Sequence, residues 1–225
     1  MKPKNIIHQS FSDKTKFDSV AVSLIIELAN NAIKKRGSFS IVLCGGGTPK
    51  DIYAKLSNAN TDWSAWHIYF GDERCLASNH PDRNSLMAEN SGLVNAAVPT
   101  SQVFPILGEL GNKIAADQYE KIVSEVDQFD LVLLGFGEDG HIASLFPGHD
   151  WDNNRLVIPV FNAPKAPSER VSLTVKGLSS TKDVIFLVAG KNKAKAFQSW
   201  DDINVTPASL ITAKNNVRIL TYDIN

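Results

Sequence analysis

A histidine and an aspartate stand two positions apart in the loop Gly135–His141, directly after a continuous apolar run. The imidazole of His141 can accept a proton near neutral pH, and the carboxylate of Asp139 can fix its tautomer and stabilise the imidazolium cation. The pair therefore predicts a general base and its partner, able to activate a water molecule. A histidine that only bonds a backbone carbonyl is the alternative, and the neighbouring loops weigh against it.

The glycine-rich segment Gly45–Pro49 is the second group with chemical potential. Its glycines let the backbone approach an anion closely, and the helix predicted over Lys50–Leu56 would aim free N–H groups at that anion. Thr48 can cap this helix or donate its hydroxyl to a phosphate oxygen. The Walker A pattern GxxxxGK[ST] does not fit the spacing. Phosphate binding and a tight strand-to-helix turn therefore both remain open.

Two further polar loops follow apolar strands. Gly71–Arg74 places two acids and an arginine after one strand, and Gly190–Lys193 follows another. Arg74, held by carboxylates such as Asp72, could point at an anionic ligand, although a surface salt-bridge cluster is the simpler interpretation. In open parallel sheets, ligands bind beyond the carboxyl ends of the strands. Four polar loops at one such edge would form a single pocket.

Other chemistries have weaker support in the sequence. Gly135–Gly140 matches the dinucleotide pattern GxGxxG, but Pro147-Gly148 leaves only His141–Phe146 for the required helix, and Val157–Asn162 lacks the acidic residue that would hold a ribose. No HExxH or CxxC pairing supports a metal site. Cys44 ends a buried strand without a clear base partner and is expected to be an inert core thiol.

The elements that must position these loops alternate along the chain. Strands are predicted over Phe39–Cys44, Trp66–Phe70, Leu131–Leu134, Val171–Val175, Val184–Ala189 and Val217–Tyr222, and helices over Phe17–Lys35, Lys50–Leu56, Asn112–Val126, Asn192–Trp200 and Pro207–Thr212. Ser12 or Asp13 could cap the first helix if it begins a turn earlier, and Gly37 could end it. The pattern predicts an α/β fold with a doubly wound, mainly parallel sheet and helices on both faces, Rossmann-like, in one domain over residues 1–225.

Composition narrows the function classes. The 225 residues carry a formal net charge of −1, which argues against a nucleic-acid binder or a polybasic membrane anchor that works by bulk charge. Only two cysteines occur, which fits a reducing compartment. The apolar runs stop well short of the roughly 20 residues that span a bilayer, and the N-terminus lacks a signal-peptide core. We expect a cytoplasmic protein.

Four segments together resemble the 6-phosphogluconolactonase family, which has the glucosamine-6-phosphate deaminase-like fold. They are Cys44–Tyr53, Phe70–Asn84, Leu133–Gly148 and Arg170–Ala194, and the third, with DGH-x-ASLFPG, is the most specific. The resemblance implies hydrolysis of 6-phosphoglucono-1,5-lactone to 6-phosphogluconate, in the oxidative pentose phosphate pathway, without metal or organic cofactor. It implies a small sugar-phosphate lactone as the partner, and a monomer or homodimer.

The resemblance also assigns roles to individual residues. His141 looks like the general base and Asp139 like its partner. The expected binding residues are Gly46, Gly47 and Thr48 of the phosphate loop, Asp72 and Arg74 of the GDER segment, Arg170 at the start of RxxLT, and Lys193 of GxxKA. Arg83 departs from the usual family pattern H-x-x-S-N, in which serine stands at this position. We therefore expect this loop to hold the substrate differently.

Two alternatives compete with the lactonase. The deaminase of the same fold, an isomerase of amino-sugar phosphates, has a glutamate in the segment AFNEP, where this chain has Phe146, which cannot move a proton. The deaminase also has DEY where this chain has Asp72–Arg74. A non-catalytic sugar-phosphate sensor is the second alternative. The chain is too short to add a helix-turn-helix domain to the sheet, and it retains the expected base.

Overall fold

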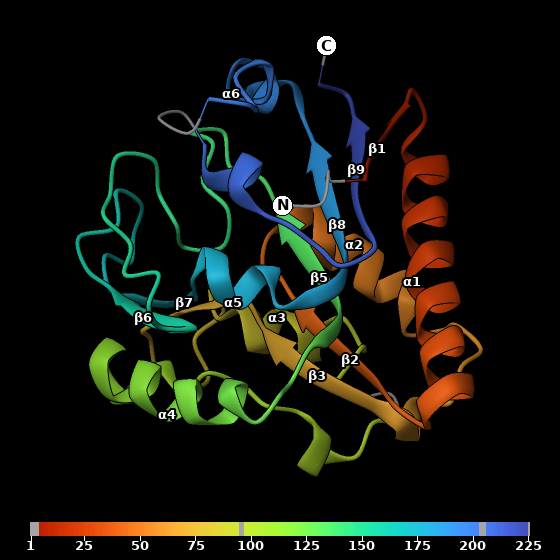
Figure 1. Cartoon of the computed structure of the whole chain (residues 1–225), viewed down its shortest axis with the longest axis horizontal. Coiled ribbons are helices and arrows are strands. Elements are labelled where there is room, and N and C mark those ends of the chain that lie inside the picture. Colours follow the sequence, from red (N-terminus) through yellow and green to blue (C-terminus); the bar gives the residue numbers. More distant parts are fainter. Residues whose placement is uncertain (1–4, 95–96, 203–205, 225) are drawn as a thin grey trace.

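A six-stranded parallel sheet forms the centre of the molecule (Figure 1). A computed structural model describes residues 5–94, 97–202 and 206–224. The strand order is β1 (Ile6–Phe11), β9 (Asn216–Tyr222), β8 (Thr181–Ala189), β5 (Phe129–Gly135), β2 (Phe39–Leu43) and β3 (Trp66–Phe70), and every pairing between these strands is parallel. The predicted α/β, doubly wound parallel architecture is confirmed.

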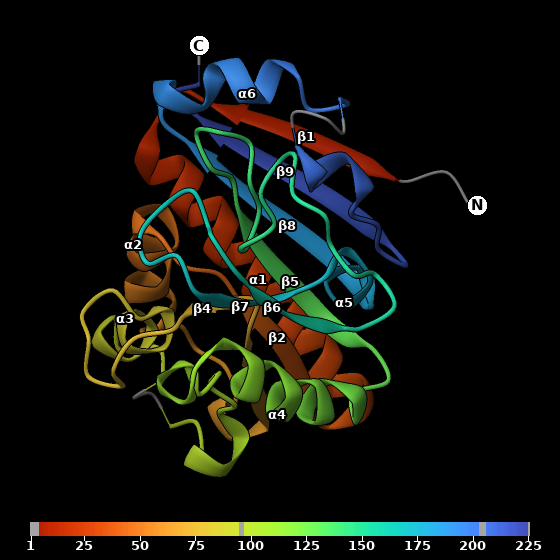
Figure 2. The same ribbon diagram turned by 90° about the vertical axis from the view of Figure 1, so that its left-hand side faces the viewer.

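The two faces of this sheet are covered differently. Helices α1 (Lys14–Arg36) and α2 (Gly47–Leu56) pack against each other on one face. A small antiparallel sheet of β4 (Asp72–Arg74), β7 (Arg170–Leu173) and β6 (Val157–Val160) lies on the other face with α4 (Asn112–Ser124) packed on it (Figure 2). The remaining helices are α3 (Asn84–Asn90), α5 (Val175–Ser179) and α6 (Ala194–Gln198), with 3₁₀ turns at Trp63–Ala65, Thr100–Gln102, Gly108–Leu110, Lys191–Lys193 and Pro207–Leu210.

The sequence explains why the central strands form. The β5 and β8 strands are apolar runs that are buried along nearly their whole length, as expected when both faces of a parallel sheet are covered. The long α1 helix starts one turn before the predicted Phe17, because the Asp13 side chain accepts a 2.7 Å hydrogen bond from the Lys16 N–H. It ends at Gly37, whose φ of 78° gives the left-handed cap predicted for that glycine.

Several predicted boundaries were wrong. The helix expected over Asn192–Trp200 is a 3₁₀ turn followed by the shorter α6, and Pro207–Thr212 forms only a 3₁₀ turn over Pro207–Leu210. The strand expected over Val171–Val175 is β7, which belongs to the small antiparallel sheet rather than to the parallel one. Within the described residues, no helix is long and apolar enough to cross a membrane.

Candidate active site

Four adjacent strands of the parallel sheet, β8, β5, β2 and β3, end at the same edge. The chain passes from β2 to β3 on one side and later returns to β5 on the other side of β2, which opens a crevice between the loops that follow β2 and β5. A pocket at this edge is lined by eight of the nine predicted site residues, which are Gly46, Gly47, Thr48, Asp72, Arg74, His141, Arg170 and Lys193. The ninth, Asp139, hydrogen-bonds the His141 ring.

The imidazole of His141 is oriented by the carboxylate of Asp139 through a hydrogen bond between Nδ1 and Oδ1. Burial raises the pKa of Asp139, but the hydrogen bond and charge of His141 outweigh burial and lower that pKa to about 2. An ionised carboxylate only accepts hydrogen bonds, so Nδ1 carries the proton of this bond, and in the neutral tautomer that this fixes, the lone pair is on Nε2. The His141 side chain is 19% exposed, so water can reach it. The pair has the properties of a general base.

The loop that carries this pair closes on itself. The Gly137 N–H donates to the His141 carbonyl at 2.8 Å, and Gly140 turns the chain with a φ of 87°. The centroids of the Phe146 and His141 rings lie 4.8 Å apart, so Phe146 packs against the imidazole. No helix follows Gly140 in this described segment, so the GxGxxG pattern here is a turn that presents His141 and not a dinucleotide fingerprint.

Gly137 leaves room for the His141 ring, since a Cβ built at Gly137 would overlap both that ring and the Asp139 carboxylate. We expect Gly137→Ala to displace the ring and to lower kcat by roughly 10- to 100-fold, because general-base catalysis needs hydrogen-bond geometry. Gly148→Ala is a suitable control: no atom lies near its built Cβ, although its φ of 75° also strains an alanine. Equal activity of Gly137→Ala and wild type would show that the ring position is not constrained in this way.

The glycine loop after β2 lines the pocket. Tyr53 of α2 clamps its start, because the Tyr53 hydroxyl donates to the Cys44 carbonyl at 2.9 Å and accepts from the Cys44 N–H at 3.0 Å. Gly46, with a φ of 109°, precedes α2, and no side chain caps this helix. Thr48 therefore does not act as the cap. The first-turn N–H groups of Gly47 and Thr48 lack intrahelical acceptors, and both residues line the pocket, an arrangement that can hold an anion.

The thiol of Cys44 lies behind this loop and is buried. Burial raises its pKa from the usual range to about 12, so the thiol stays protonated at neutral pH. This agrees with the inert core role predicted for Cys44.

Three cations line the pocket. The Arg170 guanidinium is buried, donates to the carbonyls of Pro167, Lys165 and Ala166, and lies 5.5 Å from the centroid of the Phe146 ring. Arg74 donates through Nη1 to the Asp82 carbonyl, while its buried Nε has no hydrogen-bond partner among the described residues.

Lys193 is half-buried, and burial lowers the pKa of its ammonium group. It makes no ion pair in the described part of the chain. Lys193 and the unused donors of Arg74 are therefore available to a ligand, and they favour an anion.

Asp72 has a structural role that the sequence did not indicate. Its Oδ1 accepts from Asn84 Nδ2 at 3.0 Å, and its Oδ2 accepts from Ser144 Oγ at 2.6 Å. Asn84 lines the pocket itself, and a Cβ at Gly45 would overlap the Asn84 amide. Sequence reasoning missed Asn84 and Ser144 as site residues, although both lie inside the segments that carry the family resemblance.

One expectation about the GDER segment needs correction. Asp72–Arg74, predicted as a loop, is strand β4, paired with β7 through Arg74 and Arg170. The departure from the family pattern at Arg83 led us to expect that its loop holds the substrate differently, and Arg83 itself does not line the pocket. Its side chain points into the protein between Glu73 and Glu109. Among the described residues, no group of three or more His, Cys, Asp or Glu side chains could hold a metal ion.

Comparison with known proteins agrees with this architecture. The family model described as glucosamine-6-phosphate isomerases/6-phosphogluconolactonase matches residues 12–220. A 6-phosphogluconolactonase of Nostoc sp. is 34% identical over 194 residues, which cover 82% of this chain and 80% of that protein. The crystal structure of a 6-phosphogluconolactonase from Thermotoga maritima superposes with a TM-score of 0.89 at 26% identity, covering 97% of this chain and all of that one. The chain therefore belongs to the glucosamine-6-phosphate isomerase/6-phosphogluconolactonase family.

Plant relatives are longer than this chain. The chloroplastic 6-phosphogluconolactonase 3 of Arabidopsis thaliana is 33% identical over 212 residues, which cover 85% of this chain but 65% of that protein. A probable chloroplastic 6-phosphogluconolactonase 4 of Oryza sativa subsp. indica is 36% identical over 204 residues, covering 80% of this chain and 63% of that protein. The chain thus spans just under two thirds of the length of these two relatives.

Proposed function

We propose that the protein hydrolyses 6-phosphoglucono-1,5-lactone to 6-phosphogluconate. One observation carries the proposal: an Asp139-oriented imidazole and an anion cradle with three cations line the same pocket. The names of the relatives and the shared fold support the same activity. We further propose a single-domain, cytoplasmic enzyme that acts on a sugar-phosphate lactone as a monomer or homodimer, needs no metal or organic cofactor, and binds neither nucleic acid nor membrane.

The phosphate of the substrate binds the amides of Gly46–Thr48 and the side chains of Arg74 and Lys193. A dianionic phosphate suits this part of the pocket, because charge-assisted hydrogen bonds to arginine and lysine are the strong ones. Arg170 adds a third positive charge, and Asp72 is already occupied by Asn84 and Ser144. Binding of this remote group places the lactone carbonyl, so part of the phosphate binding energy orients the reacting carbon.

His141 performs the proton transfers. Its Nε2 takes a proton from a water molecule as the water oxygen forms a bond to C1, and the carbonyl π electrons move onto the carbonyl oxygen. The positive potential of the arginines favours the oxyanion that results. When this intermediate collapses, the bond between C1 and the ring oxygen breaks, and the imidazolium returns its proton to that oxygen. Asp139 stays ionised throughout, since its pKa is about 2. A lactone is already electrophilic, so a base and a positioned water are sufficient.

The deaminase alternative requires a glutamate that this chain does not have at the corresponding position. Phe146 occupies that position, is 1% exposed and packs against His141. A phenyl ring can fix the imidazole but cannot transfer a proton. Phe146 does not argue against the sensor alternative. A protein that only binds a sugar phosphate, however, does not need an imidazole oriented by a carboxylate.

Three assays on the purified protein separate the candidate functions. The first follows lactone opening above its spontaneous rate, the second ammonia release from glucosamine 6-phosphate, and the third binding of 6-phosphogluconate by calorimetry. The proposal expects turnover in the first assay and none in the second. Ammonia release without lactone opening would favour the deaminase, and binding without any turnover would favour the sensor.

Lys193→Ala should act on binding. We expect KM for the phosphorylated lactone to rise by roughly 10- to 100-fold with kcat changed little, because a charge-assisted contact contributes about 1.5–3 kcal/mol. Lys195→Ala, two positions along and exposed, is the matched control. An unchanged KM in Lys193→Ala would remove Lys193 from the phosphate site.

A further inference from the structure

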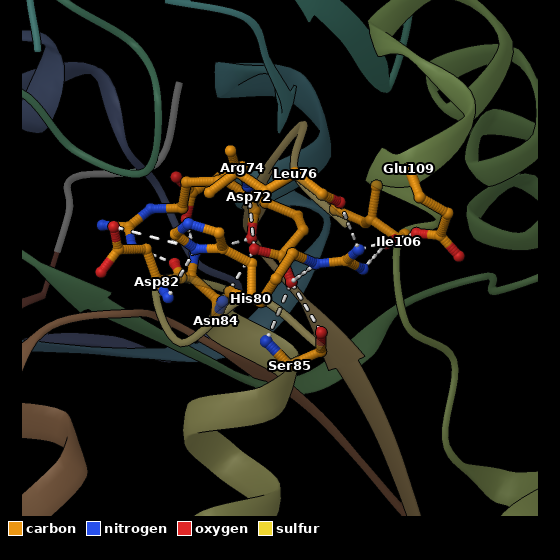
Figure 3. Close-up of polar contacts among 11 residues, drawn as sticks. Asp72, Arg74, Leu76, His80, Asp82, Asn84, Ser85, Ile106 and Glu109 are labelled. Carbon is orange, nitrogen blue, oxygen red and sulfur yellow. Dashed lines mark hydrogen bonds and ion pairs between the residues drawn. The ribbon is translucent and has the colours of Figure 1, made fainter. Parts of the chain in front are cut away.

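A buried carboxylate lies directly behind the pocket. Glu73 stands between Asp72 and Arg74 on β4 and is 0% exposed. Its Oε1 accepts the backbone N–H groups of Arg74 at 2.8 Å and Asn84 at 2.7 Å, and its Oε2 accepts the N–H and the hydroxyl of Ser85 at 2.9 and 2.7 Å (Figure 3). Glu73 thus joins β4 to the start of α3, and it fixes the backbone of two residues that line the pocket.

Arg83 balances the charge of Glu73. The Arg83 side chain is 3% exposed, and its Nε lies 3.1 Å from Glu73 Oε2 as an ion pair whose angle is not that of a hydrogen bond. The same guanidinium donates to the carbonyls of Leu76 at 3.1 Å and Ile106 at 2.7 Å and to Glu109 Oε2 at 2.7 Å. One side chain therefore ties β4, the start of α3 and the segment around Glu109 together (Figure 3).

This arrangement holds both the backbone and the side chain of Arg74. Its backbone N–H is held by Glu73, and its side-chain Nη1 donates to the carbonyl of Asp82, the residue before Arg83. The buried Nε of Arg74 remains without a partner among the described residues, so the guanidinium is held in place but not saturated. Glu73 also holds the backbone N–H of Asn84, whose side-chain amide donates to Asp72 and lies against Gly45 at the start of the anion cradle.

We propose that Arg83 is a positioning residue for phosphate recognition, acting through Glu73 and the Asp82 carbonyl on Arg74 and Asn84. The inference rests on the proposed function, because the ligand of Arg74 is taken to be the substrate's phosphate. A purely structural role for Arg83 would affect folding stability but not the preference for a phosphorylated substrate. That difference makes the proposal testable.

The test compares two substrates in Arg83→Lys, which keeps the charge but cannot reach four acceptors with one ammonium group. Initial rates are measured with 6-phosphoglucono-1,5-lactone and with glucono-1,5-lactone, each above the spontaneous rate. We expect KM for the phosphorylated lactone to rise by roughly tenfold with kcat within about twofold, because a shifted Arg74 loses part of its charge-assisted contact. The kcat/KM for the unphosphorylated lactone should stay within about twofold of wild type.

Two further variants keep the result interpretable. Glu109→Gln removes the negative charge of one outer partner of Arg83 and leaves the Glu73 contact. It should therefore move the substrate preference in the same direction by a smaller factor. Arg218→Lys makes the same change of head group at another shielded ion pair, to Asp183 at 2.8 Å, and the Arg218 side chain is 18% exposed and lies outside the pocket. It should lower the thermal midpoint and leave the preference unchanged.

The outcomes distinguish this inference from the proposed function. If wild type hydrolyses the lactone and Arg83→Lys lowers activity on both substrates equally, or changes neither, Arg83 is not a positioning residue. If wild type hydrolyses neither lactone, the proposed function fails. Calorimetry with inorganic phosphate then decides whether Arg83 supports phosphate binding. Weaker phosphate binding in Arg83→Lys than in Arg218→Lys would then support the inference, and equal binding would overturn it.

Discussion

We expect His141→Ala to lower kcat for 6-phosphoglucono-1,5-lactone by ~10²–10⁴-fold and to leave KM within about twofold, because this is the contribution expected of a general base. The imidazole is the only described group in the pocket that combines a free nitrogen lone pair with a fixed tautomer. In the proposed function the phosphate contacts come from the other loops, so we expect substrate binding to survive the substitution. Steady-state kinetics with correction for spontaneous opening measures both constants.

His149→Ala provides the matched control. Its ring centroid lies 5.9 Å from the same Phe146 ring that packs against His141, but His149 does not line the pocket. It should keep near-normal kcat. A His141→Ala enzyme with the kcat of wild type would eliminate the general-base assignment, whatever the control shows.

Asp139→Asn is expected to lower kcat on the order of 10²-fold or more while the protein stays folded. The asparagine amide can present an N–H to Nδ1, which moves the ring proton to Nε2 and removes the lone pair that accepts the proton of water. Loss of the negative charge also removes the group that stabilises the imidazolium. Since the pKa of Asp139 is about 2, wild type has the charged form at every pH where the enzyme would be assayed.

Glu138→Gln is the control for this substitution. Glu138 is exposed and pairs with Lys165 at 3.2 Å, and it lies next to Asp139 without contacting the His141 ring. Its loss should change kcat by less than about twofold, as is usual for surface ion pairs. If Asp139→Asn and Glu138→Gln had equal activity, Asp139 would have no part in orienting the base.

The parallel sheet and its polar loops could be predicted from local signals. Leu131–Leu134 and Val184–Ala189 are apolar without interruption, which indicates strands covered on both faces, and glycines or charges follow each one. Because parallel strands end at one edge, the meeting of His141 with the glycine loop follows from topology, even though 92 positions separate Pro49 from His141 (141 − 49).

The small antiparallel sheet could not be predicted in the same way. Asp72–Arg74 is three residues long and charged, and its partners Arg170–Leu173 and Val157–Val160 stand far away in the chain. Pairings of this kind depend on tertiary packing and leave no periodic pattern in the sequence. The edge strand Ile6–Phe11 was missed for a related reason, since it is mostly exposed and mixes polar with apolar residues.

The residues that support the site could not be identified from the sequence either, because their contacts also depend on tertiary packing. Ser144 reaches Asp72 across 72 positions, and Arg83 reaches Glu109 across 26. The departure at Arg83 led us to expect that its loop holds the substrate differently, but the sequence did not indicate that the guanidinium lies behind the pocket. Residue type alone does not tell whether a long side chain points into a pocket or into the protein behind it.

The most direct measurement compares wild-type kcat/KM for 6-phosphoglucono-1,5-lactone with that for glucono-1,5-lactone under identical conditions. A pocket in which a phosphate cradle orients the carbonyl toward His141 predicts a preference on the order of 10²-fold or more for the phosphorylated lactone, from two charge-assisted contacts at the phosphate. Equal values for the two lactones would contradict the account, because the anion cradle would then contribute nothing to the reaction at the imidazole.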